Sequence, residues 1–276
     1  MSQPKVWFVT GSSRGLGRIW SEAALKRGDK VAATARDSKA LQSLCDSYGD
    51  AVLPLQLDVT DREAVFAAVQ RAHKHFGRLD VILSNAGYGC MGAVEELQFD
   101  DIRENFETNF FGTLSVLQAA LPLLRVQGSG HVLTLSSMGG VVGFPTGGAY
   151  VAAKFAVEGL SESLADEVAA FGIKVTIIEP GSFATELRAS TKSAPQMSEY
   201  DAVRAAVSAR VKPENSGDPE ATAEAILQLV DSGNPPLRLL LGSHSLPLIQ
   251  RVYANRLATW DEWAQVSKAA QGKPRH

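Results

Sequence analysis

Short apolar runs alternate with amphipathic segments along most of this chain. The runs are rich in β-branched residues, as in strands buried on both faces, and they cover residues 6–10, 30–36, 51–58, 79–84, 131–136, 173–179 and 237–241. Segments with helical periodicity lie between them, at residues 16–27, 60–76, 100–125, 150–170 and 221–231. This alternation predicts a doubly wound α/β fold, with a mostly parallel sheet of about seven strands flanked by helices.

Several boundaries have local signals. Thr60 and Glu63 have the spacing of a capping box and predict that a helix begins there, and Gly77 is expected to end it. The pattern weakens in residues 183–219, which are polar, contain Pro195, Pro213 and Pro219, and predict a loop segment with one or two short helices.

An apolar stripe returns near the end of the chain. Residues 246–271 carry apolar side chains at helical spacing, which predicts a helix that packs on its own domain or on a neighbouring subunit. We therefore expect residues 1–245 to form one Rossmann-type domain, with residues 183–219 as its substrate-loop segment. Residues 246–276 are expected to form a C-terminal helical extension.

Composition excludes several classes of protein. The net charge is −3 without a basic block, which argues against nucleic-acid binding. Apolar runs are shorter than the roughly 18 residues of a membrane span, and the first residues lack a signal-peptide core, so we expect a cytoplasmic protein. Cys45 and Cys90 fit free thiols rather than a disulfide framework, and the scattered histidines indicate no metal site.

A glycine-rich turn follows the first apolar run directly. Its spacing, Gly-x-x-x-Gly-x-Gly, differs from the usual dinucleotide fingerprint, and a glycine turn alone can be a plain tight turn. Its position between a strand and a helix favours a phosphate cradle, because backbone amides and the helix dipole there attract anions. The candidate cradle residues are Gly11, Ser13, Arg14, Gly15, Leu16 and Gly17.

The end of the second predicted strand bears on cofactor choice. An acidic residue at this place would bind the ribose 2′-hydroxyl of NAD, whereas Arg36 stands there, followed by Asp37. Arg36 and Arg14 suit a 2′-phosphate, so we predict NADP(H) in preference to NAD(H). A shift of register would bring Asp37 to the ribose and favour NAD.

Tyr150 and Lys154 lie four residues apart at the start of a predicted helix. That spacing places them on one face, although such pairs also occur on ordinary surface helices. An ammonium group beside a phenol lowers its pKa, so Tyr150 could exchange a proton with an alcohol or ketone near neutral pH. Ser136 and Ser137 end the preceding apolar run.

Together these motifs resemble the classical short-chain dehydrogenase/reductase family over residues 4–245. The turn Thr10–Gly17, the pair Asp58-Val59, the turn Ser84-Asn85-Ala86-Gly87, the corner Pro180-Gly181 with Thr185, and the Tyr-x-x-x-Lys pair occur in the family's order. Ser84 departs from the family's asparagine, and this small polar residue should leave the turn intact. The resemblance implies that Asn109, Ser137 rather than Ser136, Tyr150 and Lys154 are catalytic. It also implies that Asp58, Val59, Asn85, Ala86, Gly87, Pro180, Gly181 and Thr185 hold the cofactor, together with Tyr150 and Lys154.

The expected activity is hydride transfer from NADPH to an uncharged, fairly bulky ketone or aldehyde, with Tyr150 as the general acid. Cys90, Met138, Phe144 and Phe183 are candidate pocket residues, without an arginine or lysine near them in sequence. The family also implies a homodimer or homotetramer. Two alternatives remain open, an NAD-dependent alcohol dehydrogenase and a non-catalytic NADP-binding sensor.

Overall fold

The computed structural model describes residues 4–186, 190–210 and 216–273. Within those ranges the strands are β1 Val6–Val9, β2 Lys30–Ala35, β3 Val52–Gln56, β4 Val81–Ser84, β5 Cys90–Met91, β6 Gly130–Leu135, β7 Ile173–Pro180, β8 Lys192–Ser193 and β9 Arg238–Leu241. The helices are α1 Gly15–Lys26, α2 Gln42–Tyr48, α3 Arg62–Phe76, α4 Phe99–Phe106, α5 Gly112–Gln127, α6 Gly148–Val168, α8 Asp201–Arg210, α9 Thr222–Asp231, α10 Ser245–Glu262 and α11 Ala264–Gln271. Shorter helical segments include η1 Ser38–Leu41, η3 Glu107–Phe111, η4 Met138–Gly140, η6 Ser198–Tyr200 and η8 Pro219–Ala221.

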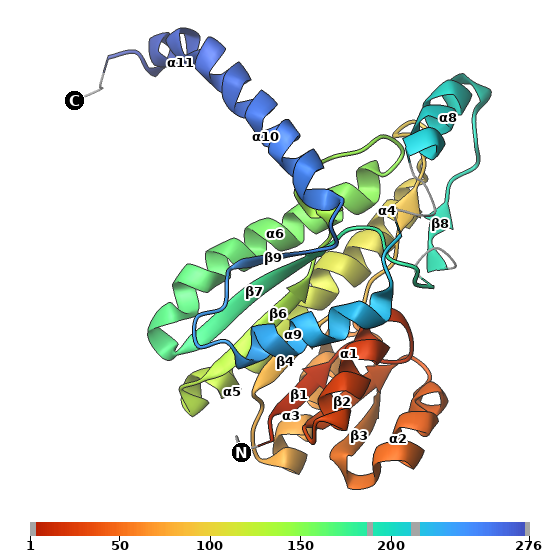
Figure 1. Ribbon diagram of the computed structural model, residues 1–276, viewed down its shortest axis with the longest axis vertical. Coiled ribbons are helices and arrows are strands. Elements are labelled where there is room, and N and C mark those ends of the chain that lie inside the picture. Colours follow the sequence, from red (N-terminus) through yellow and green to blue (C-terminus); the bar gives the residue numbers. More distant parts are fainter. Residues whose placement is uncertain (1–3, 187–189, 211–215, 274–276) are drawn as a thin grey trace.

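Seven of the described strands form one parallel sheet in the order β3-β2-β1-β4-β6-β7-β9 (Figure 1). The predicted doubly wound parallel sheet is therefore confirmed. Successive strands are added on one side of β1 as far as β3 and then on its other side from β4 onward. β1 and β4 are therefore neighbours, paired in parallel through Trp7 and Val81. Ligands of such sheets bind at this reversal of strand order, beyond the carboxyl ends of the strands.

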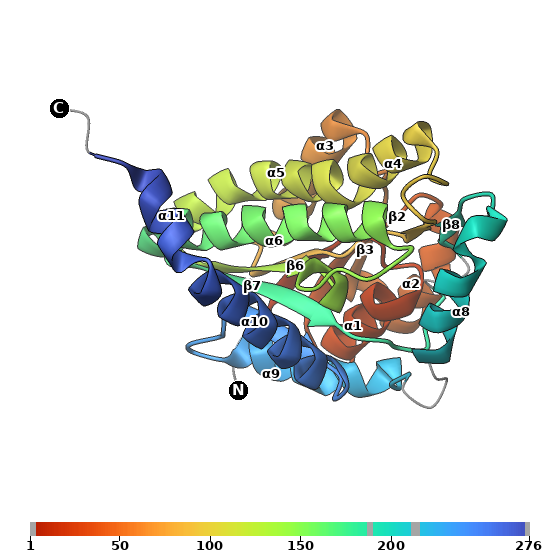
Figure 2. The ribbon, with the colours of Figure 1, turned by 90° about the horizontal axis from the view of Figure 1, so that it is seen from above.

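Helices cover both faces of the sheet (Figure 2). On β1, Phe8 packs into a core cluster that includes residues of α3, α5 and α6, whereas Trp7 packs into a second cluster that includes residues of α1 and α9. Successive strand residues point to opposite faces, so a strand buried on both sides is apolar throughout. This is why the strands appear in the sequence as unbroken apolar runs.

The helical region predicted over residues 100–125 is continuous from Phe99 to Gln127 and contains a π-helical segment, η3. Its length and composition would suffice for a membrane span, but half of its most apolar window is buried inside the protein. Thr113, Val116 and Ala120 face the interior, as in a core helix. A π segment inside an α-helix is frequently a functional site.

The start of α3 differs from the prediction. Asp61, not Thr60, is the N-cap, and its carboxylate accepts a hydrogen bond from the Ala64 amide at 2.9 Å. The Thr60 hydroxyl instead donates to Asp58 at 2.8 Å. The capping box was wrong because aspartate caps as well as threonine and stands one residue nearer the helix. Gly77, at φ 80°, ends the helix as predicted.

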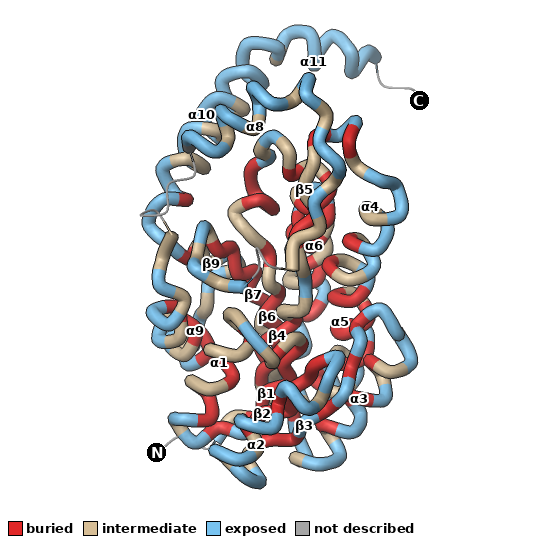
Figure 3. Tube along the Cα trace, turned by 90° about the vertical axis from the view of Figure 1, so that its right-hand side faces the viewer, coloured by how far each residue is buried: buried red, intermediate tan, exposed pale blue. Residues whose placement is uncertain are grey.

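Helices α10 and α11 project from the body and are exposed along most of their length (Figures 1 and 3). Tyr253, Leu257, Trp260 and Trp263 are 44%, 56%, 65% and 57% exposed. Packing of this stripe on its own domain is therefore wrong, and packing on a neighbouring subunit stays a prediction. The root of α10 is fixed by Ser245, which is buried.

The segment after β7 contains β8, η6 and α8, in agreement with the predicted short helices. Strand β8 pairs with β5 in a separate two-stranded sheet. Pro213 lies outside the described residues.

Candidate active site

The glycine turn after β1 has a backbone that only small residues tolerate. Gly11 and Gly15 have φ values of 71° and 56°, in the left-handed region that favours glycine. A Cβ on Gly17 would lie 2.4 Å from the Gly11 carbonyl oxygen and 2.3 Å from Asn85 Nδ2. The third glycine therefore allows α1 to begin directly against the loop after β4.

This turn fits a cofactor pyrophosphate. The first amide groups of α1 have no partner within the helix, and their dipoles favour an anion. The first turn of α1, which lies wholly within the described chain, carries no acidic side chain to compete for them. Thr185 and Glu186 lie over Gly15, with Thr185 Cβ 3.9 Å and Glu186 Oε2 3.8 Å from the position of an added Cβ. A bound pyrophosphate would repel the Glu186 carboxylate.

The loop after β4 is held against the glycine turn. The Thr10 hydroxyl accepts hydrogen bonds from the Asn85 and Ala86 amides at 2.9 and 3.0 Å, and Asn85 Nδ2 donates to the Thr10 carbonyl at 2.8 Å. Ser84, which replaces the family's asparagine, donates to the Thr113 hydroxyl at 3.1 Å. The turn is thus intact, as predicted.

Three charged residues lie at the ribose end of the predicted cofactor site. Arg14 and Arg36 are both exposed. Asp37 is also exposed, but its carboxylate accepts a hydrogen bond from the Lys39 amide at 2.9 Å and caps η1. Asp58 caps its own turn in the same way through Thr60. The carboxylate that would favour NAD is therefore engaged by its own backbone, whereas the arginines extend into solvent.

Asn109 and Lys154 meet at Gly87. Asn109, in η3, is 1% exposed, and its Nδ2 donates to the carbonyl oxygens of Tyr88 and Asn105, both at 3.0 Å. Its Oδ1 has no hydrogen-bond partner among the described residues. A Cβ on Gly87 would lie 2.4 Å from that oxygen and 3.5 Å from Lys154 Nζ. The glycine therefore leaves room for both polar groups.

Lys154 is a buried cation. It is 3% exposed, and its Nζ donates to the Leu135 carbonyl at 2.8 Å. Burial lowers the pKa of Lys154 to about 8, and the charge of Glu158 partly opposes this by raising it. Its ammonium therefore titrates much closer to neutral pH than an exposed lysine.

Tyr150 and Ser137 lie together beside Gly139. A Cβ on that glycine would lie 3.5 Å from Ser137 Oγ and 3.6 Å from Tyr150 Cε1. Ser137 Oγ accepts a hydrogen bond from the Gly139 amide at 3.1 Å. Ser136 instead lies near Gly140, where an added Cβ would be 2.3 Å from its Oγ. The two serines therefore face different surroundings.

The predicted lowering of the Tyr150 pKa by Lys154 is not observed. Burial raises the pKa of Tyr150, and a hydrogen bond with Ser137 opposes that rise. Lys154 Nζ lies 5.8 Å from the centroid of the Tyr150 ring and donates to the Leu135 carbonyl. Desolvation of a 7% exposed phenol outweighs the hydrogen bond with Ser137, so the phenol is protonated at neutral pH.

The corner after β7 is tightly packed. The Gly181 amide donates to the Leu241 carbonyl at 2.9 Å, and an added Cβ on Gly181 would lie 2.4 Å from Ser245 Oγ. Pro180, the last residue of β7, therefore leads into a turn that is fixed by the root of α10. Phe183 packs against Gly217 and Gly242 near this corner.

Two other segments approach each other on the predicted substrate side. Phe144 packs against Gly139, which follows Met138 in the chain, and its Cε1 would lie 3.0 Å from a Cβ on that glycine. The segment after β5 joins the same region, because Gly92 pairs with Gly147. Thr146 has a φ of 62°, which is strained for a β-branched residue and fixes the bend of this wall.

Cys90 pairs with Lys192 in the β5–β8 sheet, so the fold brings a lysine that is distant in the sequence beside this candidate pocket residue. Its ammonium group bonds Asp101 at 2.9 Å and Glu104 at 2.5 Å, which neutralises it. Burial raises the pKa of the Cys90 thiol, which fits a lining residue rather than a nucleophile.

The buried carboxyl groups that sequence reasoning missed include those of Glu96, Glu158 and Glu179. Glu158 follows Lys154 at the same four-residue spacing that linked Lys154 to Tyr150, so that spacing could have identified it. Glu96 and Glu179 have no comparable local signal, because their partners are distant in the sequence.

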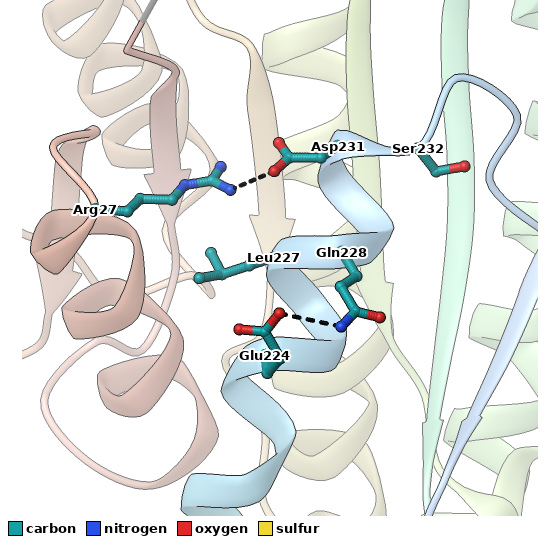
Figure 4. Close-up of a pocket in the computed structure, with 6 residues that line it drawn as sticks. All are labelled: Arg27, Glu224, Leu227, Gln228, Asp231 and Ser232. Carbon is teal, nitrogen blue, oxygen red and sulfur yellow. Dashed lines mark hydrogen bonds and ion pairs between the residues drawn. The ribbon is translucent and has the colours of Figure 1, made fainter. Parts of the chain in front are cut away.

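A surface pocket also lies between α1 and α9, near the amino ends of the strands and so away from the candidate site at their carboxyl ends (Figure 4). It is lined by Arg27, Glu224, Leu227, Gln228, Asp231 and Ser232. Arg27 is paired with Asp231 at 2.9 Å, and Gln228 with Glu224 at 3.0 Å. None of these lining residues belongs to the site described above.

Comparison with known proteins relates the chain to oxidoreductases. A sequence model described as short chain dehydrogenase matches residues 5–196. Oxidoreductase BOA17 of Botryotinia fuckeliana is 41% identical, over 96% of this chain and 99% of that protein. A 3-ketodihydrosphingosine reductase of Bacteroides thetaiotaomicron is 36% identical over 91% of each chain. Human 17-beta-hydroxysteroid dehydrogenase type 1 is 35% identical over 89% of this chain and 80% of its own length.

Solved structures show the same architecture. A short-chain dehydrogenase from Streptomyces avermitilis has a TM-score of 0.91 at 39% identity, covering 98% of this chain and 99% of that one. ElxO with NADP bound has a TM-score of 0.76 at 29% identity, covering 89% of this chain and 100% of that one. An alcohol dehydrogenase from the archaeon Thermococcus sibiricus, complexed with 5-hydroxy-NADP, has a TM-score of 0.74 at 27% identity, covering 88% and 98%.

Proposed function

This chain belongs to the short-chain dehydrogenase family, and from that premise we propose that it is an NADP(H)-dependent reductase of an uncharged, bulky ketone or aldehyde. The observation that carries the proposal is the placement of Ser137 and Tyr150 around Gly139, with the buried Lys154 beside the Tyr150 ring. A hydroxyl, a phenol and an ammonium group close together can hold a carbonyl oxygen and protonate it.

The chemistry divides between the cofactor and the chain. When bound, NADPH supplies the hydride. Tyr150 donates its proton to the developing alkoxide, and the raised pKa of the phenol keeps that proton available at neutral pH. Ser137 orients the carbonyl oxygen by donating a hydrogen bond to it. Lys154 stabilises the tyrosinate that remains, and Asn109 Oδ1 can hold a water near Lys154 for return of the proton.

The preference for NADP(H) rests on the ribose end of the site. Arg14 and Arg36 are exposed there, while the Asp37 carboxylate caps η1. Guanidinium groups suit a 2′-phosphate, and a free carboxylate would repel it. NADP-bound ElxO and the NADP-analogue complex from Thermococcus sibiricus support the same choice.

The proposed substrate class rests on the pocket walls and on two relatives. Met138, Phe144 and Cys90 are apolar, and the nearby Lys192 is neutralised by two carboxylates. The relatives named as a 3-ketodihydrosphingosine reductase and a 17-beta-hydroxysteroid dehydrogenase support a ketone on a large apolar skeleton. Aliphatic and steroidal ketones are therefore the first compounds to test.

The alternatives differ in a measurable way. An NAD-dependent alcohol dehydrogenase would prefer NADH, and an NADP-binding sensor would bind NADPH without consuming it. We expect NADPH consumption with apolar ketones and a preference for NADPH over NADH that Arg36→Asp reverses. NADPH binding without consumption on the whole ketone panel would support the sensor.

The same family membership supports assembly into a homodimer or homotetramer. Phe111 in η3 and Phe155 in α6 are 46% and 38% exposed. They lie on the two helical regions that commonly pair between subunits in this family, so this surface is the proposed interface.

A further inference from the structure

Two buried carboxyl groups lie close to one arginine, and one of them is on the helix that carries Lys154. Glu158 is four residues after Lys154 in α6, hence one turn along the same face, and is 5% exposed. Glu179, near the end of β7, is 2% exposed. The proposed mechanism assigns neither of them a task.

Among the described residues outside α6, one cation is available to compensate the two carboxyl groups. Arg238, in β9, places its Nε 3.2 Å from Glu158 Oε2 and 3.4 Å from Glu179 Oε1. The same guanidinium also bonds the exposed Glu162 at 3.0 Å. Two carboxylates buried against one shared arginine carry an excess of negative charge, which is costly in a low-dielectric interior.

The two carboxyl groups also lack hydrogen-bond donors. Within the described chain, the Oε1 atoms of Glu158 and Glu179 accept no hydrogen bond. A proton on one carboxyl group, donated to the other, would remove the excess charge and supply the missing donor at once. Burial and the charge of Glu158 raise the pKa of Glu179 to about 7, with Arg238 opposing. A hydrogen bond between the two carboxyl groups would add to this rise.

We propose that Glu158 and Glu179 share one proton, and that this carboxyl pair is a positioning device whose single negative charge keeps the buried Lys154 ammonium protonated. The pair touches no substrate and acts through Lys154, because the charge of Glu158 opposes the effect of burial on that ammonium. The role of Lys154 in turnover rests on the proposed function, whereas its protonation by the pair does not.

The surroundings contain few other ionisable groups. The charged and titratable side chains that face the pair come from α6 and β9, and among the described residues they are Lys154, Glu162 and Arg238. The segment after β6 adds the uncharged Ser136 hydroxyl, and η4 adds Gly140, at which a Cβ would lie 3.1 Å from Glu158 Oε1.

The sign of each effect follows from these charges. Glu158→Gln leaves the single charge on Glu179, and because the charge of Glu158 is the one that raises the pKa of Lys154, that pKa falls below its value of about 8. Glu179→Gln keeps a hydrogen-bond donor but fixes the pair at one charge, so the titration near pH 7 disappears. Glu162→Gln is the matched control, because Glu162 bonds the same Arg238 but its side chain is 60% exposed.

The experiment is a titration of Lys154 by NMR in protein labelled at lysine nitrogen, with the signal assigned by its absence in Lys154→Met. We expect Lys154 to titrate at lower pH in Glu158→Gln, at the original pH in Glu162→Gln, and again near the original pH in Glu158→Asp. An unchanged Lys154 titration in folded Glu158→Gln, or an equal shift in Glu162→Gln, overturns the proposal.

A second titration needs no variant and so does not depend on variants folding. In wild-type protein labelled at glutamate carboxyl carbon, one buried carboxyl group should titrate near neutral pH. Titration of every glutamate below pH 5 overturns the shared proton. Neither titration requires turnover, so lack of ketone reduction would count against the proposed function alone. With turnover, the alkaline limb of the kcat/KM profile should move to lower pH in Glu158→Gln and stay in place in Glu162→Gln.

Discussion

Ser136 and Ser137 are neighbours in the chain, but their hydroxyl groups face different partners. Ser137 Oγ lies beside Gly139 and Tyr150, whereas Ser136 Oγ lies against Gly140 on the side of Glu158. A hydrogen-bond donor aimed at a developing oxyanion contributes to catalysis, while a buried hydroxyl elsewhere contributes mainly to packing.

Ser137→Ala should therefore lower kcat/KM for a ketone on the order of 10²-fold, because it removes a donor to the carbonyl oxygen. Ser136→Ala should keep most of the turnover. The comparison needs initial rates of NADPH consumption, with thermal melting to confirm that both variants fold. Equal losses in the two variants would count against the assignment of Ser137.

His131, at the start of β6, links the sheet to the loop before β9. Its Nε2 lies 3.0 Å from Thr176 Oγ1, and that hydroxyl donates to the Pro236 carbonyl at 2.7 Å. The hydroxyl has one proton, so it accepts from His131, which is then the Nε2–H tautomer. Its Nδ1 has no partner in the described chain, which fits a neutral ring.

Burial lowers the pKa of His131 to about 4, and the charge of Lys174 acts in the same direction. The unfolded chain therefore binds a proton between about pH 6.5 and 4 that the folded chain does not. Acidification from pH 7 to 5 should cost about 2 kcal/mol of folding free energy through this residue.

Urea unfolding at the two pH values measures this loss. It should be smaller by that amount in His131→Asn and unchanged in the control His75→Asn, where the ring is exposed. The account of His131 fails if both variants lose the same free energy as wild type.

Helix α8 is joined to the loop before α4 by a buried carboxylate. Glu96, with its side chain 1% exposed, accepts hydrogen bonds from the Met197 amide at 2.7 Å and the Ala93 amide at 2.7 Å. Arg204 of α8 bonds the same carboxylate at 2.5 Å and also donates to the Met197 carbonyl. These bonds fix the middle of the substrate-loop segment, and the Met197 amide helps to keep the pKa of Glu96 low.

Glu96→Gln should loosen residues 198–210, because it weakens the pairing with Arg204. We expect faster limited proteolysis in that segment and a higher KM for the ketone, with NADPH affinity unchanged. Glu95→Gln is the control, since Glu95 is exposed and bonds only the Tyr200 hydroxyl among the described contacts. The same protease sensitivity in wild type and Glu96→Gln would show that this contact does not hold the segment.

Helices and strands that are specified by their own residues could be predicted from the sequence. The apolar runs marked the strands of the main sheet, with ends within two residues of those observed, because strands buried on both faces carry no polar positions. The π segment around Asn109 could not be predicted, since one extra residue in a helical turn leaves the apolar pattern of residues 100–125 nearly unchanged.

The site was predictable where motifs fix the backbone and not where distant chains meet. The glycine turn and the Tyr150–Lys154 spacing identified positions that the structure brings close together. The bonds of Glu96 to α8 and of Glu179 to Arg238 cross long stretches of sequence, so no spacing reveals them. The Tyr150 pKa was predicted in the wrong direction because burial cannot be read from a residue pair.

At the scale of the whole molecule, the main sheet positions the candidate active site, whereas α10 and α11 are added outside the sheet and the helices that cover it. The order β3-β2-β1-β4-β6-β7-β9 brings the loops after β1, β4, β6 and β7 to one edge, where the cofactor and catalytic residues are expected. The exposed helices α10 and α11 lie outside this core but are joined to it, since Arg256 donates to the Val141 carbonyl at 3.3 Å. Contacts of α10 can therefore reach the segment between Ser137 and Tyr150.

The account as a whole depends on Tyr150 as a proton donor in NADPH-dependent ketone reduction. The measurement is the rate of NADPH consumption with apolar ketones by wild type and Tyr150→Phe, with NADPH binding measured separately. We predict turnover by wild type, a loss on the order of 10³-fold in Tyr150→Phe, and nearly equal NADPH affinity. Turnover in Tyr150→Phe within about tenfold of wild type would contradict the account.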